Sequence, residues 1–187
     1  MSENKLVASL VLRTIDIAPT SAEPLANVGL IVDNDYGTFT ANACVVTWKN
    51  VNIRTCLGEL YRKYNRFNLK VTAAQIRSNG IATTDSQLII YMSGLPFTSG
   101  STYSTRSGPT NQAAIGMVNF IVAAGTGATT PLIAGLVSFD KPLQDVTNIT
   151  VELKNSSNNA LVNGYSEKPA IRIPHWSIMC DIYGVED

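Results

Sequence analysis

The chain is patterned as a series of short β-strands separated by polar turns. In residues 148–154 apolar and polar side chains alternate, so Ile149, Val151 and Leu153 can face a core while their neighbours face water. The same period of two recurs in residues 175–183. The whole pattern predicts about eight strands, each a β-branched or aromatic run bounded by turn-forming residues. Their ranges are 6–15, 43–53, 67–76, 86–94, 114–122, 132–139, 148–154 and 175–184.

Several of these strands have a single apolar face, and this predicts the fold class. Strands of that kind form antiparallel sheets that bury one face each, and two such sheets stack on each other. Long polar connections at 18–30, 99–112, 123–131 and 155–169 favour a sandwich over an up-and-down barrel. We therefore expect an all-β protein, a single eight-stranded antiparallel jelly-roll sandwich. Other sandwich topologies also fit this pattern.

One segment, residues 55–64, has a helical period instead. Its apolar positions follow the spacing i, i+3, i+4 and i+7, at Leu57, Leu60, Tyr61 and Tyr64. Thr55 is the expected N-cap. Gly58 weakens the helix by up to about 1 kcal/mol relative to alanine, so packing of the apolar stripe onto the sandwich must hold it. The sequence thus predicts one short helix between two strands.

Composition and charge describe a globular chain with no bulk attraction to nucleic acid. The 187 residues are 45% hydrophobic and 15% charged, and the formal net charge is zero. A chain of this length buries a sizeable core, and no change in composition divides it, so we expect one domain over residues 1–187. Partners are expected to be recognised by shape rather than by overall charge.

The beginning of the chain, MSENKLVASLVLRTID, lacks the apolar core and small-residue cleavage site of a secretory signal. No stretch approaches the ~20 apolar residues that a bilayer span requires. We therefore expect no signal peptide and no membrane span, in a protein made in a cytoplasm.

Residues able to carry catalysis or hold a metal are few and scattered. Cys44, Cys56 and Cys180 are odd in number and form no CxxC pair, which favours buried free thiols. His175 is the only histidine and is surrounded by no nucleophile motif. The run 33–37, DNDYG, resembles the front of a calcium loop, but Cys44 stands where the loop needs its glutamate, so a turn between strands is expected. We expect no cofactor, no metal and no enzyme activity.

Positive charge gathers around the predicted helix. Glu59 is the only acid among six cations: Lys49, Arg54, Arg62, Lys63, Arg66 and Lys70. Aromatic residues lie between them, and such a pattern can stack the bases of nucleic acid, although packing in the core takes Tyr61 and Tyr64 first. Cations near the last turn also interact favourably with the negative end of the helix dipole. The remaining candidates for contact with another subunit are Arg62, Lys63 and Arg66.

Three stretches carry a resemblance to a known family. They are LGELYRKYNRFNL at 57–69, LIIYMSGLPF at 88–97, and the terminal strand that ends in DIYG at 181–184. With the strands around them, they resemble small single jelly-roll proteins of large icosahedral double-stranded DNA viruses, among them penton and minor capsid proteins. The turn SGLPF at 93–97 is also similar to segments of viral fibre and tail-tip domains.

The resemblance implies a structural protein of the virion. Pentons of this family are homopentamers that close the five-fold vertices of an icosahedral capsid and contact the major and minor capsid proteins around them. A five-fold ring needs two complementary surfaces on one chain. Arg62, Lys63 and Arg66 would then face acids of the adjacent subunit. The candidate acids are Asp33, Asp35, Glu186 and Asp187.

Other functions remain open at this stage. The first alternative is a minor capsid or fibre-tip protein. The second is a glycan-binding β-sandwich module used in host attachment, because the polar loops carry Tyr103 and Tyr165. An enzyme of undetermined type is the third, although no catalytic set is visible.

Overall fold

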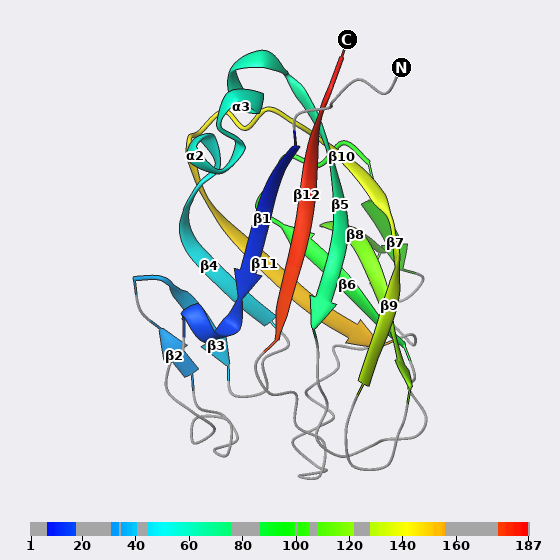
Figure 1. The fold of residues 1–187 in the computed structure, drawn as a ribbon. Helices are drawn as coiled ribbons and strands as arrows, with labels where there is room; N and C mark the ends of the chain where they lie inside the picture. The colour runs from blue at the N-terminus through cyan, green and yellow to red at the C-terminus, as the bar shows by residue number, and fades with distance from the viewer. Residues whose placement is uncertain are drawn as a thin grey trace.

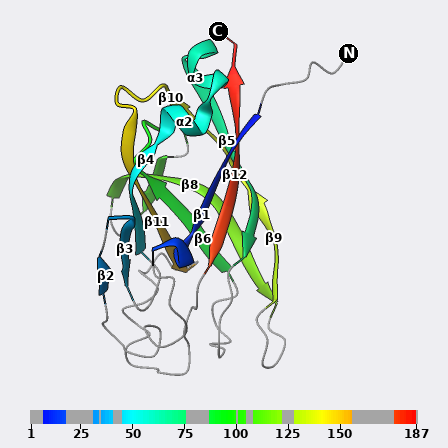
Figure 2. The ribbon, with the colours of Figure 1, turned by 60° about the vertical axis from the view of Figure 1, so that its left-hand side comes forward.

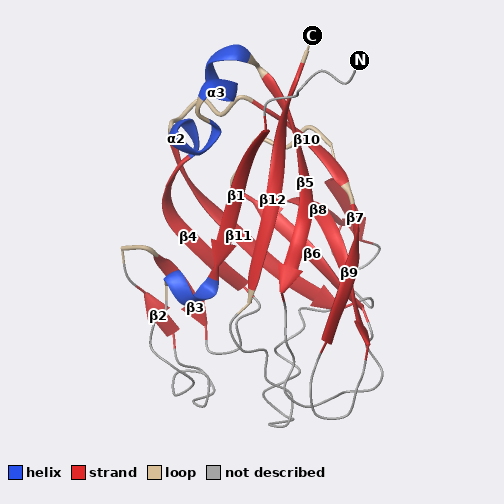
Figure 3. Ribbon diagram, viewed as in Figure 1, coloured by secondary structure: helices blue, strands red, loops and turns tan. Residues whose placement is uncertain are grey.

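The structure is a computed structural model, and it describes nine ranges of the chain. They are residues 7–17, 31–33, 35–40, 45–75, 87–99, 101–104, 108–121, 128–155 and 176–186. In these ranges the chain is an all-β sandwich of two antiparallel sheets with few helical turns (Figure 3). In Figure 1, β1, β12 and β5 lie in front of β11, β6 and β8 and cross them at an angle.

The smaller sheet has four strands in the order β1-β12-β5-β10. Their bounds are Val7–Arg13 for β1, Ser177–Val185 for β12, Arg66–Gln75 for β5 and Leu136–Asp140 for β10. The larger sheet follows the order β2-β3-β4-β11-β6-β8-β7, and β9 also pairs with β8. These strands are β2 (Ile31–Asp33), β3 (Gly37–Thr40), β4 (Val45–Asn52), β11 (Val146–Asn155), β6 (Gln87–Ser93), β8 (Gly108–Ile121), β7 (Ser101–Ser104) and β9 (Ala128–Ala134).

Every strand expected from the sequence corresponds to a strand of the structure, and the range 132–139 spans the end of β9 and most of β10. The described ranges contain more strands than the eight expected, because β2, β3, β7 and β9 are added. Two of these, GTFT in β3 and STYS in β7, are short and rich in Thr and Ser. Such runs carry little apolar alternation, so only pairing with a neighbouring strand marks them as β-structure.

The core lies between the two sheets, and the alternating strands supply it as expected. Ile149, Val151 and Leu153 of β11 are fully buried. Ile178, Cys180 and Ile182 of β12 are buried from the other side, together with Trp176 just before that strand. In the same core Phe67 stacks on Phe139, with ring centroids 5.2 Å apart. Alternation in the sequence therefore correctly predicted which side chains point inward.

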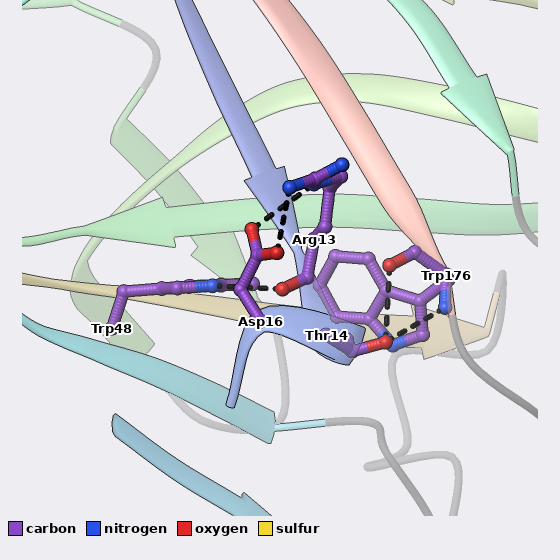
Figure 4. A network of polar contacts seen from close by, with 5 residues as sticks. All are labelled: Arg13, Thr14, Asp16, Trp48 and Trp176. Atoms are coloured by element: carbon purple, nitrogen blue, oxygen red, sulfur yellow. Dashed lines mark hydrogen bonds and ion pairs between the residues drawn. The ribbon is translucent and has the colours of Figure 1, made fainter. Parts of the chain in front are cut away.

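Polar contacts near the end of β1 connect it with the larger sheet and with the start of β12 (Figure 4). Trp48 of β4 donates from Nε1 to the carbonyl of Arg13, at 3.2 Å, and packs edge-on against Trp176. The hydroxyl of Thr14, in the single 3-10 turn Thr14–Asp16, donates to the carbonyl of Trp176 and accepts from its N–H. Thr14 is completely buried, so both bonds satisfy groups that water cannot reach.

The expected helix at 55–64 is present in an altered form. It is two single turns, α2 (Ile53–Leu57) and α3 (Glu59–Lys63), which meet at Gly58 with a φ of 53°. Thr55 is not the N-cap: the side-chain oxygen of Asn52 accepts from the N–H of Thr55, at 2.8 Å. A glycine adopts positive φ without steric cost, so the chain turns there instead of continuing one helix.

Candidate interaction surface at the helical end

Four of the six basic residues singled out from the sequence, Arg54, Arg62, Lys63 and Arg66, lie where α2 and α3 cover one end of the sandwich (Figures 1 and 2). The other two lie elsewhere: Lys49 is on β4, where it pairs with Asp33, and Lys70 is further along β5. We call this region the helical end and define it as residues 53–66 and 140–145. Leu57 and Leu60 are buried against the core, and Tyr61 and Tyr64 are half-buried beside them. The predicted apolar stripe therefore does hold these short turns onto the sheets.

A second segment completes the helical end. We call residues 141–145, between β10 and β11, the braced loop. The N–H of Lys141 donates to the carbonyl of Asn65 at 2.7 Å, and the N–H of Ile53 donates to the carbonyl of Asp145 at 2.8 Å. Both ends of the loop are thus bonded to the segments that flank α2 and α3. Backbone bonds of this kind hold a loop in one position.

Tyr61 connects the braced loop to both helical turns. Its hydroxyl donates to Asp145 Oδ1 at 3.0 Å, and the other oxygen of Asp145 pairs with Arg54 at 3.2 Å. Lys141 Nζ lies 4.7 Å from the centre of the Tyr61 ring, within cation–π range. The hydrogen bond to Asp145, aided by partial burial, raises the pKa of the Tyr61 hydroxyl. Tyr61 therefore stays a neutral donor that fixes the loop.

The three predicted contact residues are exposed at the rim of this surface. Arg62 pairs with Glu59 at 3.5 Å, and Arg66 of β5 pairs with Asp140 of β10 at 3.7 Å. Lys63 Nζ lies 5.2 Å from the centre of the Tyr64 ring. Exposed ion pairs are weak, so these cations can exchange their internal partners for those of another molecule at small cost.

Tyr64 is held by the end of β12. Gly184 lies so close that a Cβ at this position would overlap the Tyr64 ring. The close approach brings α3 against the terminal strand, whose Gly184 pairs with Phe67 of β5. Packing of Tyr64 on a glycine therefore fixes the position of the turn that carries Arg62 and Lys63.

Sequence reasoning missed the most exposed apolar side chain of the helical end. Leu143, at the tip of the braced loop, is fully exposed (103%). Pro142 beside it is buried. The signal that was available is the run KPLQD at 141–145, in which a leucine stands between polar residues in a connection. Neither Lys141 nor Asp145 was distinguishable as a partner of Tyr61, because they meet it only in the folded chain.

The candidate acids lie in different places. Asp33 is at the end of β2, where it accepts hydrogen bonds from Lys49 and Thr38, and these bonds lower the pKa of its carboxyl. Asp35 is exposed in the turn from β2 to β3, as expected for a turn between strands at 33–37, although Asn34 lies outside the described residues. Glu186 is exposed and follows β12, whose end lies beside the turn after α3, because Gly184 contacts Tyr64. Asp187 lies outside the described residues.

Of the residues considered for chemistry, Cys180 is buried, as expected, and Cys56 is only half-buried. Cys56 and Cys180 are free, and burial raises the pKa of the Cys180 thiol to about 12. Four more of these residues or side chains lie outside the described part of the chain: Cys44, His175, Tyr165 and the side chain of Tyr103. Within the described residues, no group of His, Cys, Asp and Glu side chains is arranged to hold a metal ion. No helix in those ranges combines the length and apolar character needed to cross a membrane.

Comparisons with known proteins add no identification to this geometry. No protein-family model matches the chain, and no curated protein sequence matches it either.

Proposed function

We propose that this chain is a structural virion protein with a single jelly-roll fold, and that its role is the penton at the five-fold vertices of an icosahedral capsid. In this proposal the chain assembles as a homopentamer, contacts major and minor capsid proteins, and does mechanical rather than catalytic work. The structural observation that carries the jelly-roll part of the proposal is the way in which the strands pair.

The strand pairing is nested. The eight strands that match the sequence pattern are, in chain order, β1, β4, β5, β6, β8, β10, β11 and β12. The first pairs with the last, β4 with β11, β5 with β10, and β6 with β8, always antiparallel. Pairs nested in this way form when one long antiparallel ribbon folds over into two sheets. This supports a jelly roll built from two Greek keys.

A jelly roll alone does not establish a function, so a second observation is needed. Jelly rolls build many viral capsids, and the stretches that resemble pentons occupy defined places in this fold. Residues 57–69 form α3 with its flanking turns and the start of β5, residues 88–97 form β6 and the turn after it, and 181–184 end β12. The resemblance therefore extends over strands of both sheets and favours the capsid role over an unrelated sandwich.

The helical end fits one side of a subunit contact. A ring of five uses a heterologous interface, in which one surface of each subunit meets a different surface of the next. Arg62, Lys63 and Arg66 are exposed on a turn and a strand that are packed in place, which suits a contact between preformed surfaces.

Location in the particle tests the proposal directly. A cryo-EM reconstruction of purified virions should place this chain at the five-fold vertices. Native mass spectrometry of the isolated chain should show a ring of five. Absence of the chain from purified particles would overturn the capsid role. Its presence at positions other than the vertices would replace the penton with a minor capsid or fibre role.

Charge reversal tests the proposed contact residues. The double variant Arg62→Glu, Arg66→Glu should weaken assembly, because like charges would then face each other across the interface. Circular dichroism and the melting temperature should stay close to wild type, since both side chains are exposed. Lys70→Glu, an exposed change elsewhere on β5, is the matched control. Intact rings in the double variant would show that Arg62 and Arg66 are solvent-exposed residues with no part in the subunit contact.

A further inference from the structure

The two most exposed large hydrophobic side chains of the described residues lie on separate surfaces. Leu143 is fully exposed (103%) at the tip of the braced loop, and Tyr36 is 70% exposed in the turn between β2 and β3. Single exposed apolar residues are common and need no explanation alone. These two differ because each lies on a segment that backbone hydrogen bonds hold to its neighbours, and because the two segments lie on surfaces of opposite net charge.

The surface around Leu143 is basic. The helical end carries five cations against three acids. The cations are Arg54, Arg62, Lys63, Arg66 and Lys141, and the acids are Glu59, Asp140 and Asp145. The backbone bonds of the braced loop and the bond from Tyr61 to Asp145 hold the two ends of the loop that carries Leu143. A loop whose ends are held before binding loses less conformational entropy when it binds a partner.

The surface around Tyr36 is acidic. We call Asp33 and residues 35–37 the acidic turn. It contains two carboxylates, and the cation bonded to it is Lys49, which pairs with Asp33. The N–H of Lys49 also donates to the carbonyl of Tyr36 at 2.9 Å, so the turn is tied to β4. Tyrosine is enriched at the centres of protein interfaces because it offers a large, rigid contact area.

The two surfaces complement each other in charge, and each presents one apolar anchor. They cannot meet within one molecule, because the acidic turn lies well below α2 and α3 along the sandwich in both Figure 1 and Figure 2. A contact between them must therefore join two molecules. Such a contact is heterologous, since it uses a different surface on each side.

We propose that the helical end of one chain binds the acidic turn of a second copy of this chain, with Leu143 and Tyr36 as the apolar anchors. The cations at the rim of the helical end face Asp33 and Asp35 of the neighbour. This contact deepens the proposed function and rests on it, because head-to-tail contacts of this kind close into a ring when the rotation between neighbours allows it.

Replacing either apolar anchor with a polar residue tests the contact in the full chain. Leu143→Asp and Tyr36→Ser should each raise the dissociation constant of the assembly by at least about tenfold, measured by sedimentation and native mass spectrometry. Both side chains are exposed, so the melting temperature should change little. Leu136→Asp, on β10 outside both surfaces, is the matched control and should assemble as wild type does.

A mixing experiment separates this contact from a symmetric one. In a mixture of the two variants, the Tyr36→Ser chain still has Leu143 and the Leu143→Asp chain still has Tyr36. One unlike pair can therefore form a single intact contact, and neither chain can extend it further. The mixture should therefore form mixed dimers and no rings. An isologous contact through either surface alone gives no such preference for unlike chains.

The outcomes distinguish this inference from the proposed function. Rings of five that persist in both single variants would overturn the contact and leave the penton role standing. A wild-type chain that stays monomeric at every concentration tested would also overturn the contact. A chain that forms rings sensitive to both variants, yet is absent from virions, would support the contact and overturn the capsid role.

Discussion

The indole of Trp48 donates a hydrogen bond to the carbonyl of Arg13, with 3.2 Å between Nε1 and the oxygen. Trp48 belongs to β4 in the larger sheet, and Arg13 ends β1 in the smaller one, so the bond crosses from one sheet to the other (Figure 4). β1 is an edge strand of the smaller sheet. The indole therefore fastens this edge strand to the other sheet.

Replacing Trp48 with phenylalanine should destabilise the protein by about 2 kcal/mol, because the bond is lost and the smaller ring leaves a void. Trp48→Ala should cost more, about 3–5 kcal/mol. Urea unfolding followed by circular dichroism measures both. Equal stability of Trp48→Phe and wild type would show that the bond to Arg13 contributes nothing.

The hydroxyl of Thr14 gives a second test of the buried polar contacts. Thr14→Val keeps the shape of the side chain but leaves the N–H of Trp176 without the acceptor it has at 2.9 Å. An unsatisfied buried donor costs about 1–3 kcal/mol, which unfolding in urea detects. Thr14→Ser retains the hydroxyl and should lose less. A serine variant that is less stable than the valine variant would contradict this role for the hydroxyl.

The position of the N-cap is tested by a matched pair of variants. Asn52→Ala should lower stability by about 0.5–2 kcal/mol, because the N–H of Thr55 loses its acceptor. Thr55→Ala should have a much smaller effect, since it is the backbone of Thr55, not its side chain, that takes part in the cap. Thermal unfolding compares the two. The opposite ranking would restore Thr55 as the cap that the sequence pattern suggested.

The contact between Gly184 and Tyr64 predicts strong coupling between two substitutions. Gly184→Ala should cost about 1–3 kcal/mol, because the new Cβ would overlap the Tyr64 ring and displace it. In a Tyr64→Ala background the same glycine substitution should be nearly neutral. A double-mutant cycle from urea unfolding measures this coupling. Additive effects would mean that the cost of Gly184→Ala has another source.

Burial of Cys180 predicts a fall in stability at alkaline pH. The pKa of this thiol rises from 9.0 to about 12 in the folded chain, so between these pH values the unfolded chain loses a proton that the folded chain keeps. Stability falls with pH wherever the folded state binds more protons, so this contribution destabilises the protein progressively from about pH 9 to pH 12. Cys180→Ala should reduce that slope when unfolding free energies are compared across the range. Parallel curves for the two proteins would contradict the assignment.

The sequence predicted local features well where they depend on the period of the side chains. Ile149, Val151 and Leu153 are buried because alternate residues of a strand face opposite sides, whatever the strand pairs with. Leu57 and Leu60 are buried for the corresponding reason in a helical turn. The cap was misassigned because Asn52 and Thr55 are both good cap residues, and only the backbone path at the end of β4 decides between them. The break at Gly58 likewise depends on how the chain must turn to reach β5.

The candidate site was predicted only in part. Exposure of Arg62, Lys63 and Arg66 followed from their places beside the apolar stripe. The ion-pair partner of Arg66 could not be predicted from the sequence. It is Asp140, which is far away in the sequence and meets Arg66 because β10 pairs with β5. The position of the braced loop and its exposed Leu143 depends on bonds between residues far apart in the sequence, such as the bond between Tyr61 and Asp145, which are 84 positions apart.

By itself, the sequence determined the all-β character of the chain, the inward faces of its main strands and the apolar stripe between β4 and β5. Each of these depends on side chains a few residues apart, whose directions the local backbone geometry sets. Only the tertiary structure decided which strands pair, where Leu143 and Tyr36 lie relative to the charges, and which groups join the two sheets. Those features depend on contacts between distant segments, and many pairings satisfy the same alternating pattern until a single packed core selects one of them.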